Sequence, residues 1–312
     1  MAASPTIRPG QEGAMDEERA RSDRVLPTSR ILGAAIVPFL VVAFLVLYPR
    51  PTDTQDWFAW TIRPTMTPMV LGSAYLGGAW FFVRVVRADR WHTVRIGFIP
   101  VTVFASCLGL ATIIHWDKFN HGHVAFWLWA GLYFTTPFLV LGAYLWNQTT
   151  SPPASPDELR VTTVARSLMA ATGIAAVGLG AYLYLVPVRA ITIWPWALTP
   201  LTARVMGAVL LLGIAGILAA IDARWSSCTV MIDVARIMIA LILVAAVRAH
   251  DEFDTSRPLT WLLGIGLTAV LIGATALDLS MRHRASGAAP REPAADAVGR
   301  YRLSTRPETT DP

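Results

Sequence analysis

Residues 115–123 read HWDKFNHGH and join two long apolar segments of this 312-residue chain. A partial copy, HDEFD at residues 250–254, lies about 134 residues further on, again between apolar segments. At the same offset Asp117 corresponds to Asp251, Phe119 to Phe253, Trp127 to Trp261, and Arg90-Trp91 to Arg224-Trp225. We therefore expect an internal duplication in which each copy holds one of these polar loops.

The composition is typical of a membrane protein. Hydrophobic residues make up 54% of the chain, only 15% are charged, and the mean hydropathy is +0.49, whereas about a quarter of the residues of a soluble domain are charged. Eight apolar segments are each near the ~20 residues that a helix needs to cross a bilayer. They cover residues 30–49, 66–87, 94–116, 123–147, 164–186, 200–221, 226–247 and 259–280.

The predicted fold is an all-α membrane protein with eight transmembrane helices arranged as two tandem four-helix repeats. An even number of spans per repeat gives both repeats the same orientation, related by an axis along the membrane normal. The expected parts are a disordered cytoplasmic tail (1–28), the first repeat (29–148), a cytoplasmic linker (149–162), the second repeat (163–283) and a second disordered tail (284–312).

Two local patterns predict helix geometry. Thr199 is a suitable N-cap for a helix that has Pro200 in its first position. Thr172, Ala176 and Gly180 place small side chains one turn apart, which lets helix backbones approach closely in lipid.

The basic residues indicate an orientation in the membrane. The chain carries 26 Lys and Arg against 21 Asp and Glu, and most of the cations lie in the tails and in the connections near residues 90, 155 and 224. These parts share one side of an eight-span protein, so the positive-inside rule predicts that both termini are cytoplasmic. The expected partners are membrane lipids with anionic headgroups, not nucleic acid. Lys118 is the sole lysine, which excludes a P-loop.

Aromatic pairs lie on two corresponding external loops. Trp57 and Trp60 precede the second span, and Trp194 and Trp196 precede the sixth. Such rings usually lie at the headgroup level, but paired tryptophans beside prolines are also suited to the floor or lid of a ligand pocket. Arg204, one turn inside the sixth span, is expected to extend outward or to pair with an external acid.

The seventh span contains two opposite charges, Asp233 and Arg236, three residues apart. Each costs ~2.5–3.5 kcal/mol near the bilayer centre, so they are expected to pair and face the bundle interior. One interpretation is a substrate counter-ion or proton relay between the halves, and the other is a structural ion pair. Asp222 and Asp278 lie near cytoplasmic span ends, where hydration is expected to suffice.

The first external loop also contains a candidate metal site. His115, Asp117, His121 and His123 supply imidazole and carboxylate groups of the kind that bind zinc or copper. Their spacing matches no established metal motif, and a hydrated interfacial loop is the alternative. Haem is not indicated, because no histidine lies at mid-span.

The second copy also carries a family resemblance. The run WPWALTPLTAR at residues 194–204, followed by Gly207 and set in a duplicated layout, resembles a group of uncharacterised eight-span integral membrane proteins of high-GC Gram-positive bacteria. The resemblance implies a bacterial inner membrane and no particular activity. The first half departs from the motif, because Arg63 stands where the second half has Thr199.

The working hypothesis is a carrier or binder of a small or lipid-like molecule. Its expected site lies between the repeats, near Asp233 and Arg236 and beneath the tryptophan loops. One alternative is a membrane-embedded enzyme that uses the histidine loop with a metal, although an enzyme is not favoured. The other is a non-catalytic scaffold subunit with a membrane-complex partner or a second copy of itself.

Overall fold

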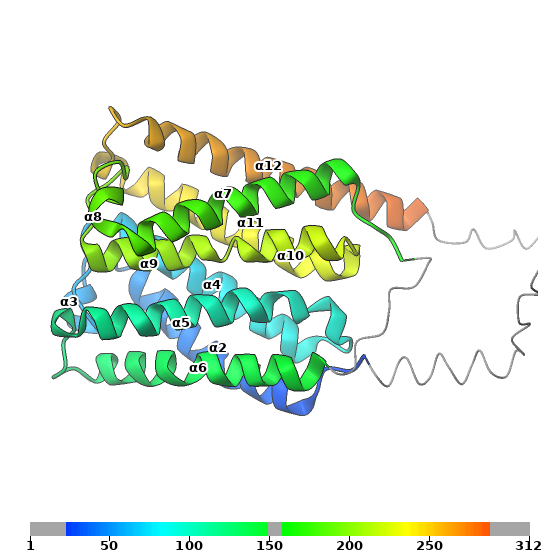
Figure 1. Cartoon of the computed structure of the whole chain (residues 1–312), viewed down its shortest axis with the longest axis horizontal. Coiled ribbons are helices and arrows are strands. Elements are labelled where there is room, and N and C mark those ends of the chain that lie inside the picture. Colours follow the sequence, from blue (N-terminus) through cyan, green and yellow to red (C-terminus); the bar gives the residue numbers. More distant parts are fainter. Residues whose placement is uncertain (1–22, 149–157, 288–312) are drawn as a thin grey trace, which may run out of the picture.

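Eight helices that are long and apolar enough to cross a membrane lie side by side in the computed structural model, which describes residues 23–148 and 158–287 (Figure 1). The described residues contain no β-strand, so the all-α prediction is confirmed. The described chain begins and ends at the same end of the bundle (Figure 1). The expected tails and linker lie mostly outside the described residues.

The eight spans agree closely with the predicted segments. They are α2 (Pro27–Leu47), α4 (Met66–Arg87), α5 (Phe98–Ile114), α6 (Val124–Gln148), α7 (Thr163–Leu185), α9 with α10 (Pro200–Leu211 and Ile214–Asp222), α11 (Trp225–Arg248) and α12 (Pro258–Gly287). Short helices fill the connections: α3 (Thr54–Trp57), η1 (Trp91–Thr93), η2 (Arg95–Gly97), η3 (Trp116–Lys118), α8 (Pro187–Ala190) and η4 (His250–Glu252).

The predicted start of the sixth span is confirmed. Thr199 is the N-cap of α9, with Pro200 in the first turn. The Thr199 hydroxyl accepts a hydrogen bond from the Thr202 backbone N–H at 3.2 Å, and the Thr202 hydroxyl accepts one from the Thr199 N–H at 2.8 Å. These two bonds form a capping box, which satisfies two donors that a helix start otherwise leaves free.

The sixth span is broken near Gly213. The N–H groups of Leu212, Gly213, Ala215 and Gly216 all bond to carbonyls three residues earlier, which tightens the backbone between α9 and α10. The corresponding span of the first half, α4, is one continuous helix. The sixth span therefore consists of two helical pieces.

The spans pack in pairs within each half. In the first half α2 packs on α4 and α5 packs on α6; in the second, α7 packs on α9 and α10, and α11 packs on α12. The halves meet through α4 against α11 and α5 against α9. The outer faces expose large apolar side chains such as Ile31, Phe138 and Leu262, which suit contact with lipid tails.

Several hydrogen bonds recur at corresponding places in the two halves. The Val25 N–H donates to the Asp89 carbonyl in the first half, and the Val161 N–H donates to the Ala223 carbonyl in the second. Similarly, the Asn120 N–H donates to the Ala59 carbonyl and the Asp254 N–H to the Pro195 carbonyl. The Trp127 indole donates to the His121 carbonyl, and the Trp261 indole donates to the Thr255 carbonyl. The two halves therefore close their loops with the same bonds.

Small residues allow close contact between α7 and α9 in the second half. A Cβ added to Gly207 of α9 would lie 2.7 Å from the Gly180 carbonyl oxygen of α7, and one added to Gly180 would lie 2.8 Å from the Gly207 carbonyl oxygen. Both obstacles are backbone atoms that cannot rotate away. The expectation that Gly180 allows close helix packing is therefore confirmed.

We predict that Gly207→Ala lowers the thermal unfolding midpoint in detergent, because the new methyl group forces α7 and α9 apart at a cost of ~1–3 kcal/mol. Gly178→Ala, on the same helix as Gly180, is the matched control, since its new methyl group meets nothing within 4 Å. Equal midpoints for the two variants would contradict this account of the packing.

Candidate functional site

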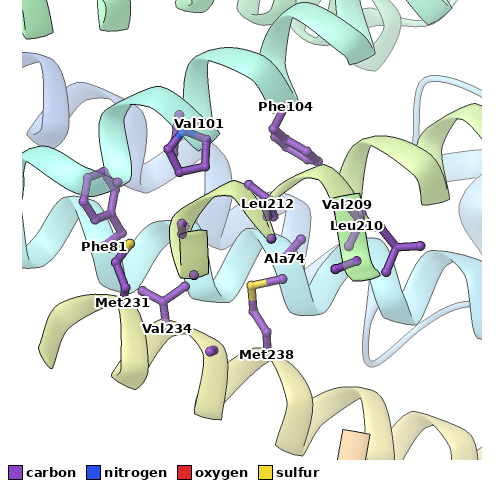
Figure 2. Close-up of a pocket in the computed structure, with 18 of the residues that line it drawn as sticks. Ala74, Phe81, Val101, Phe104, Val209, Leu210, Leu212, Met231, Val234 and Met238 are labelled. Atoms are coloured by element: carbon purple, nitrogen blue, oxygen red, sulfur yellow. The ribbon is translucent and has the colours of Figure 1, made fainter. Parts of the chain in front are cut away.

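A cavity of about 370 Å³ lies between the two halves (Figure 2). Its walls come mainly from α4, α5, α7, the sixth span (α9 and α10) and α11, and Figure 2 shows Phe81, Val101, Phe104, Leu212 and Met238 around it. Among the described residues that line it, none is charged. The volume falls in the range of small-molecule sites, which are typically apolar with a few placed polar groups.

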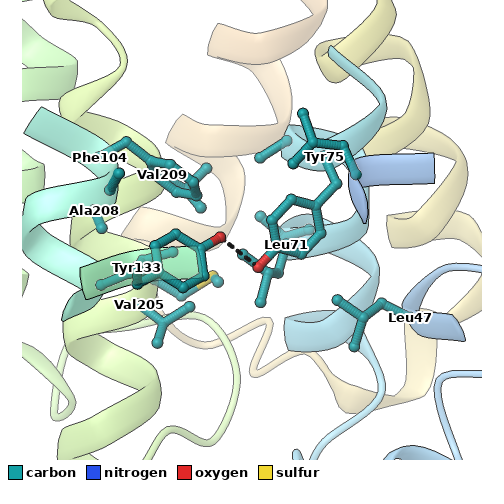
Figure 3. Packing of buried hydrophobic residues seen from close by; sticks show 14 of the residues in the cluster. Leu47, Leu71, Tyr75, Phe104, Tyr133, Val205, Ala208 and Val209 are labelled. Atoms are coloured by element: carbon teal, nitrogen blue, oxygen red, sulfur yellow. Dashed lines mark hydrogen bonds between the residues drawn. The ribbon is translucent and has the colours of Figure 1, made fainter. Parts of the chain in front are cut away.

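The polar side chains of the lining are Tyr75, Tyr133, Thr136 and Thr172, and the two tyrosines among them meet at the cavity (Figure 3). The hydroxyl oxygens of Tyr75 on α4 and Tyr133 on α6 lie 2.7 Å apart, and the residues are only 2% and 4% exposed. Trp129 packs against the Tyr133 ring with 4.3 Å between centroids, and its indole donates to the Thr112 hydroxyl at 2.8 Å. This packing holds Tyr133 in place from behind.

Two other tyrosines tie the halves together. The Tyr48 hydroxyl donates to the Leu241 carbonyl of α11 at 2.7 Å, and the Tyr184 hydroxyl donates to the Cys107 carbonyl of α5, also at 2.7 Å. Each half thus donates one such bond to a mid-helix carbonyl of the other. The two bonds fix the register of the helices that wall the cavity.

The predicted charge couple forms, but the structure places it away from the cavity. The Arg236 guanidinium lies 3.6 Å from the Asp233 carboxylate and only 2.7 Å from that of Asp278 on α12. Arg282 contacts the other oxygen of Asp278 at 2.8 Å. The prediction that hydration satisfies the charge of Asp278 is wrong, since this residue is 4% exposed and two arginines pair with it.

The tryptophan loops also lie outside the cavity lining. Trp60, Trp194 and Trp196 are buried in aromatic clusters of the loops at the end of the bundle away from the described termini, whereas Trp57 is 58% exposed. The Trp196 indole donates to the Thr67 hydroxyl at 2.9 Å, so it joins the second half to the start of α4. In the described structure these residues fasten loops and do not reach the cavity.

Arg204 pairs with a histidine of the other half. Its guanidinium donates to Nε2 of His115 at 2.7 Å, and neither Asp251 nor Asp254 is its partner. Burial, followed by the charge of Arg204, lowers the pKa of His115 below its usual value. The neutral imidazole is therefore the form that accepts this bond.

The other candidate metal ligands also have neighbours that occupy them. Asp117 pairs with Lys118 at 2.8 Å, Nδ1 of His123 accepts from the Ala125 N–H, and His121 packs against Phe126. Within residues 23–148 and 158–287 no group of three or more His, Cys, Asp or Glu side chains is arranged to hold a metal ion. The zinc or copper prediction gains no support from this geometry.

The sequence analysis missed a polar network at the end of the bundle where the described chain begins and ends. The Asp222 carboxylate lies 2.6 Å from both Arg95 and Arg224, so it joins the two halves. The assignment of Asp222 to a hydrated span end is wrong, because its side chain is 6% exposed. His92 donates its backbone N–H to Asp23, and its ring lies between the carboxylates of Asp23 and Glu158.

We predict that acidification weakens the fold through His115. Its pKa is depressed in the folded chain, so the unfolded chain binds the proton first; stability is complete above about pH 6.5 and falls as pH drops through that value. His115→Gln keeps an acceptor for Arg204 without a titrating group, and its unfolding midpoint is expected to fall less than that of the parent between about pH 7.5 and pH 5.5. An identical fall in both proteins would refute the assignment.

A second prediction concerns Asp222. Asp222→Asn leaves the buried Arg224 and its neighbour Arg95 without their shared carboxylate, which is expected to destabilise the fold by about 3 kcal/mol. Asp89→Asn is the matched control, because Asp89 is 95% exposed and its pair with Arg30 spans 3.4 Å in solvent. Thermal unfolding of both variants measures the two losses of stability. Similar losses would contradict the assignment of the larger effect to the buried carboxylate.

Comparison with known proteins identifies no relative of this chain. No family model, no curated protein and no solved structure matches the chain. The resemblance drawn from residues 194–204 is not tested by these comparisons and stays a prediction. The function has to be argued from the cavity and its surroundings.

Proposed function

We propose that this protein binds an uncharged, lipid-like molecule in the cavity between its halves and acts as a carrier or reservoir for it in the membrane. The observation that carries the proposal is a cavity of about 370 Å³, walled by both halves and lined without charged residues. Such a site matches a molecule that already dissolves in lipid tails. It offers nothing to a hydrated ion or a charged metabolite, whose burial there is strongly unfavourable.

The outer helices support a route from the lipid. Leu40 of α2, Leu132 of α6 and Thr172 of α7 all contribute to the lining, so the cavity extends outward between the helix pairs. Thr172 is itself exposed, so the cavity is not closed at this helix. A ligand that enters between helices crosses no aqueous phase.

The same proposal includes the setting of the protein. We take the membrane to be a bacterial inner membrane, as the resemblance of residues 194–204 implies, and both termini to be cytoplasmic, following the distribution of basic residues. We take the halves to be tandem repeats of like orientation; the recurring loop hydrogen bonds and the reciprocal bonds of Tyr48 and Tyr184 support this.

The test is to fill the cavity. Ala74, buried on α4, lines the cavity, and Ala74→Leu would occupy its space. We expect the apolar lipid that co-purifies with the parent, measured by mass spectrometry of solvent extracts, to fall about tenfold per mole of protein, which corresponds to ~1.4 kcal/mol.

Gly266→Leu is the matched control, because a side chain at this α12 position meets nothing within 4 Å. It places a leucine on the exposed face of α12 instead of in the cavity and is expected to keep the parent's bound lipid. If all three proteins carry the same lipids in the same amounts, the cavity is not the binding site and the proposal fails.

A further inference from the structure

The tyrosine pair holds one hydroxyl proton that no described group accepts. Tyr75 and Tyr133 bring two hydroxyl protons, and their mutual bond at 2.7 Å uses one of them. Neither hydroxyl has another hydrogen-bond partner among the described residues. Whichever tyrosine donates, the other keeps a free O–H. A buried donor without an acceptor is unfavourable and uncommon in folded proteins.

The side chains that Figure 3 labels around the two hydroxyls, Leu71, Phe104, Val205 and Val209, are apolar and offer no acceptor. Thr136 also lines the cavity, but its hydroxyl is bonded to neither tyrosine in the described structure. Both tyrosines line the cavity. The free proton therefore has to find its acceptor in whatever occupies the cavity.

The charge of that acceptor follows from its depth. Tyr75 lies near the middle of α4 and Tyr133 near the middle of α6, so the pair is far from either end of the bundle. Since no cation lines the cavity, a carboxylate or phosphate there would be a buried charge without a partner. The acceptor must be neutral.

A neutral hydroxyl on the ligand fits less well than a carbonyl. An alcohol can accept the free proton, but it brings a further proton that needs an acceptor in the same apolar surroundings. A carbonyl oxygen accepts and brings no proton. It therefore completes the hydrogen bonding of the pair.

We infer that the ligand is an uncharged lipid with a carbonyl oxygen within its apolar body, a ketone or quinone, and that the Tyr75–Tyr133 pair hydrogen-bonds this oxygen. The inference rests on the proposed function and adds the chemical class of the ligand. The tyrosines are binding residues that select among lipids, whereas the rest of the lining contributes apolar contact.

The experiment compares probes of equal length in nanodiscs that contain the protein, dialysed against protein-free nanodiscs. The probes are n-undecane, methyl nonyl ketone and the corresponding secondary alcohol. We expect the ketone to bind about fivefold more tightly than undecane, with the alcohol between them. The infrared C=O band of isotope-labelled ketone should shift to lower frequency on binding, as a hydrogen-bonded carbonyl does.

The double variant Tyr75→Phe with Tyr133→Phe keeps both rings and removes both hydroxyls. It is expected to bind undecane as the parent does, to lose the preference for the ketone, and to leave the bound C=O band unshifted. Tyr182→Phe, on the outer surface of α7 and outside the cavity lining, is the control and should retain the preference and the shift.

The outcomes separate the two proposals. If the double variant keeps both the ketone preference and the shifted band, the carbonyl inference is wrong while apolar binding stands. If the parent prefers the alcohol, the inference is also wrong. If the parent binds none of the probes beyond their partition into empty nanodiscs, the proposed function fails and the inference falls with it.

Discussion

Helices in lipid gain little from hiding apolar side chains from one another, because the lipid tails are just as apolar. The eight spans therefore have to be held together by close backbone contact and by polar bonds. Gly180 against Gly207 supplies the first kind, and Tyr48 and Tyr184 supply the second at mid-helix. Because the two tyrosine bonds fasten the halves to each other, the space between them need not be filled, and a cavity persists where a soluble core would close.

Sequence reasoning recovered the features that depend on neighbours along the chain. The eight spans follow from runs of apolar residues, and the start of α9 follows from Thr199 and Pro200, which act within one helical turn. The closeness of Asp233 and Arg236 also follows from their spacing. These features are local, so no knowledge of helix packing is needed to predict them.

Apart from the close approach at Gly180, the features that depend on packing were not recovered. Asp278 has closer contact with Arg236 than Asp233 has, and Asp222 reaches Arg95 of the other half; no spacing in the sequence encodes either contact. The cavity has no sequence signal either, since apolar residues that line a space look the same as those that fill one. Tyr75 and Tyr133 meet only because α4 and α6 of one half converge on the cavity.

The break in the sixth span makes the two walls of the cavity different in structure. Leu212 and Gly213, at the junction of α9 and α10, belong to the lining, whereas α4 opposite them is an unbroken helix. A change in hydrogen-bond pattern allows a helix to bend, so α9 and α10 can differ in axis direction while Thr199 keeps its bonds at one end and Asp222 stays bonded to its two arginines at the other. One wall of the cavity is therefore a single continuous element and the other has two segments, so a ligand between them meets two surfaces of different outline.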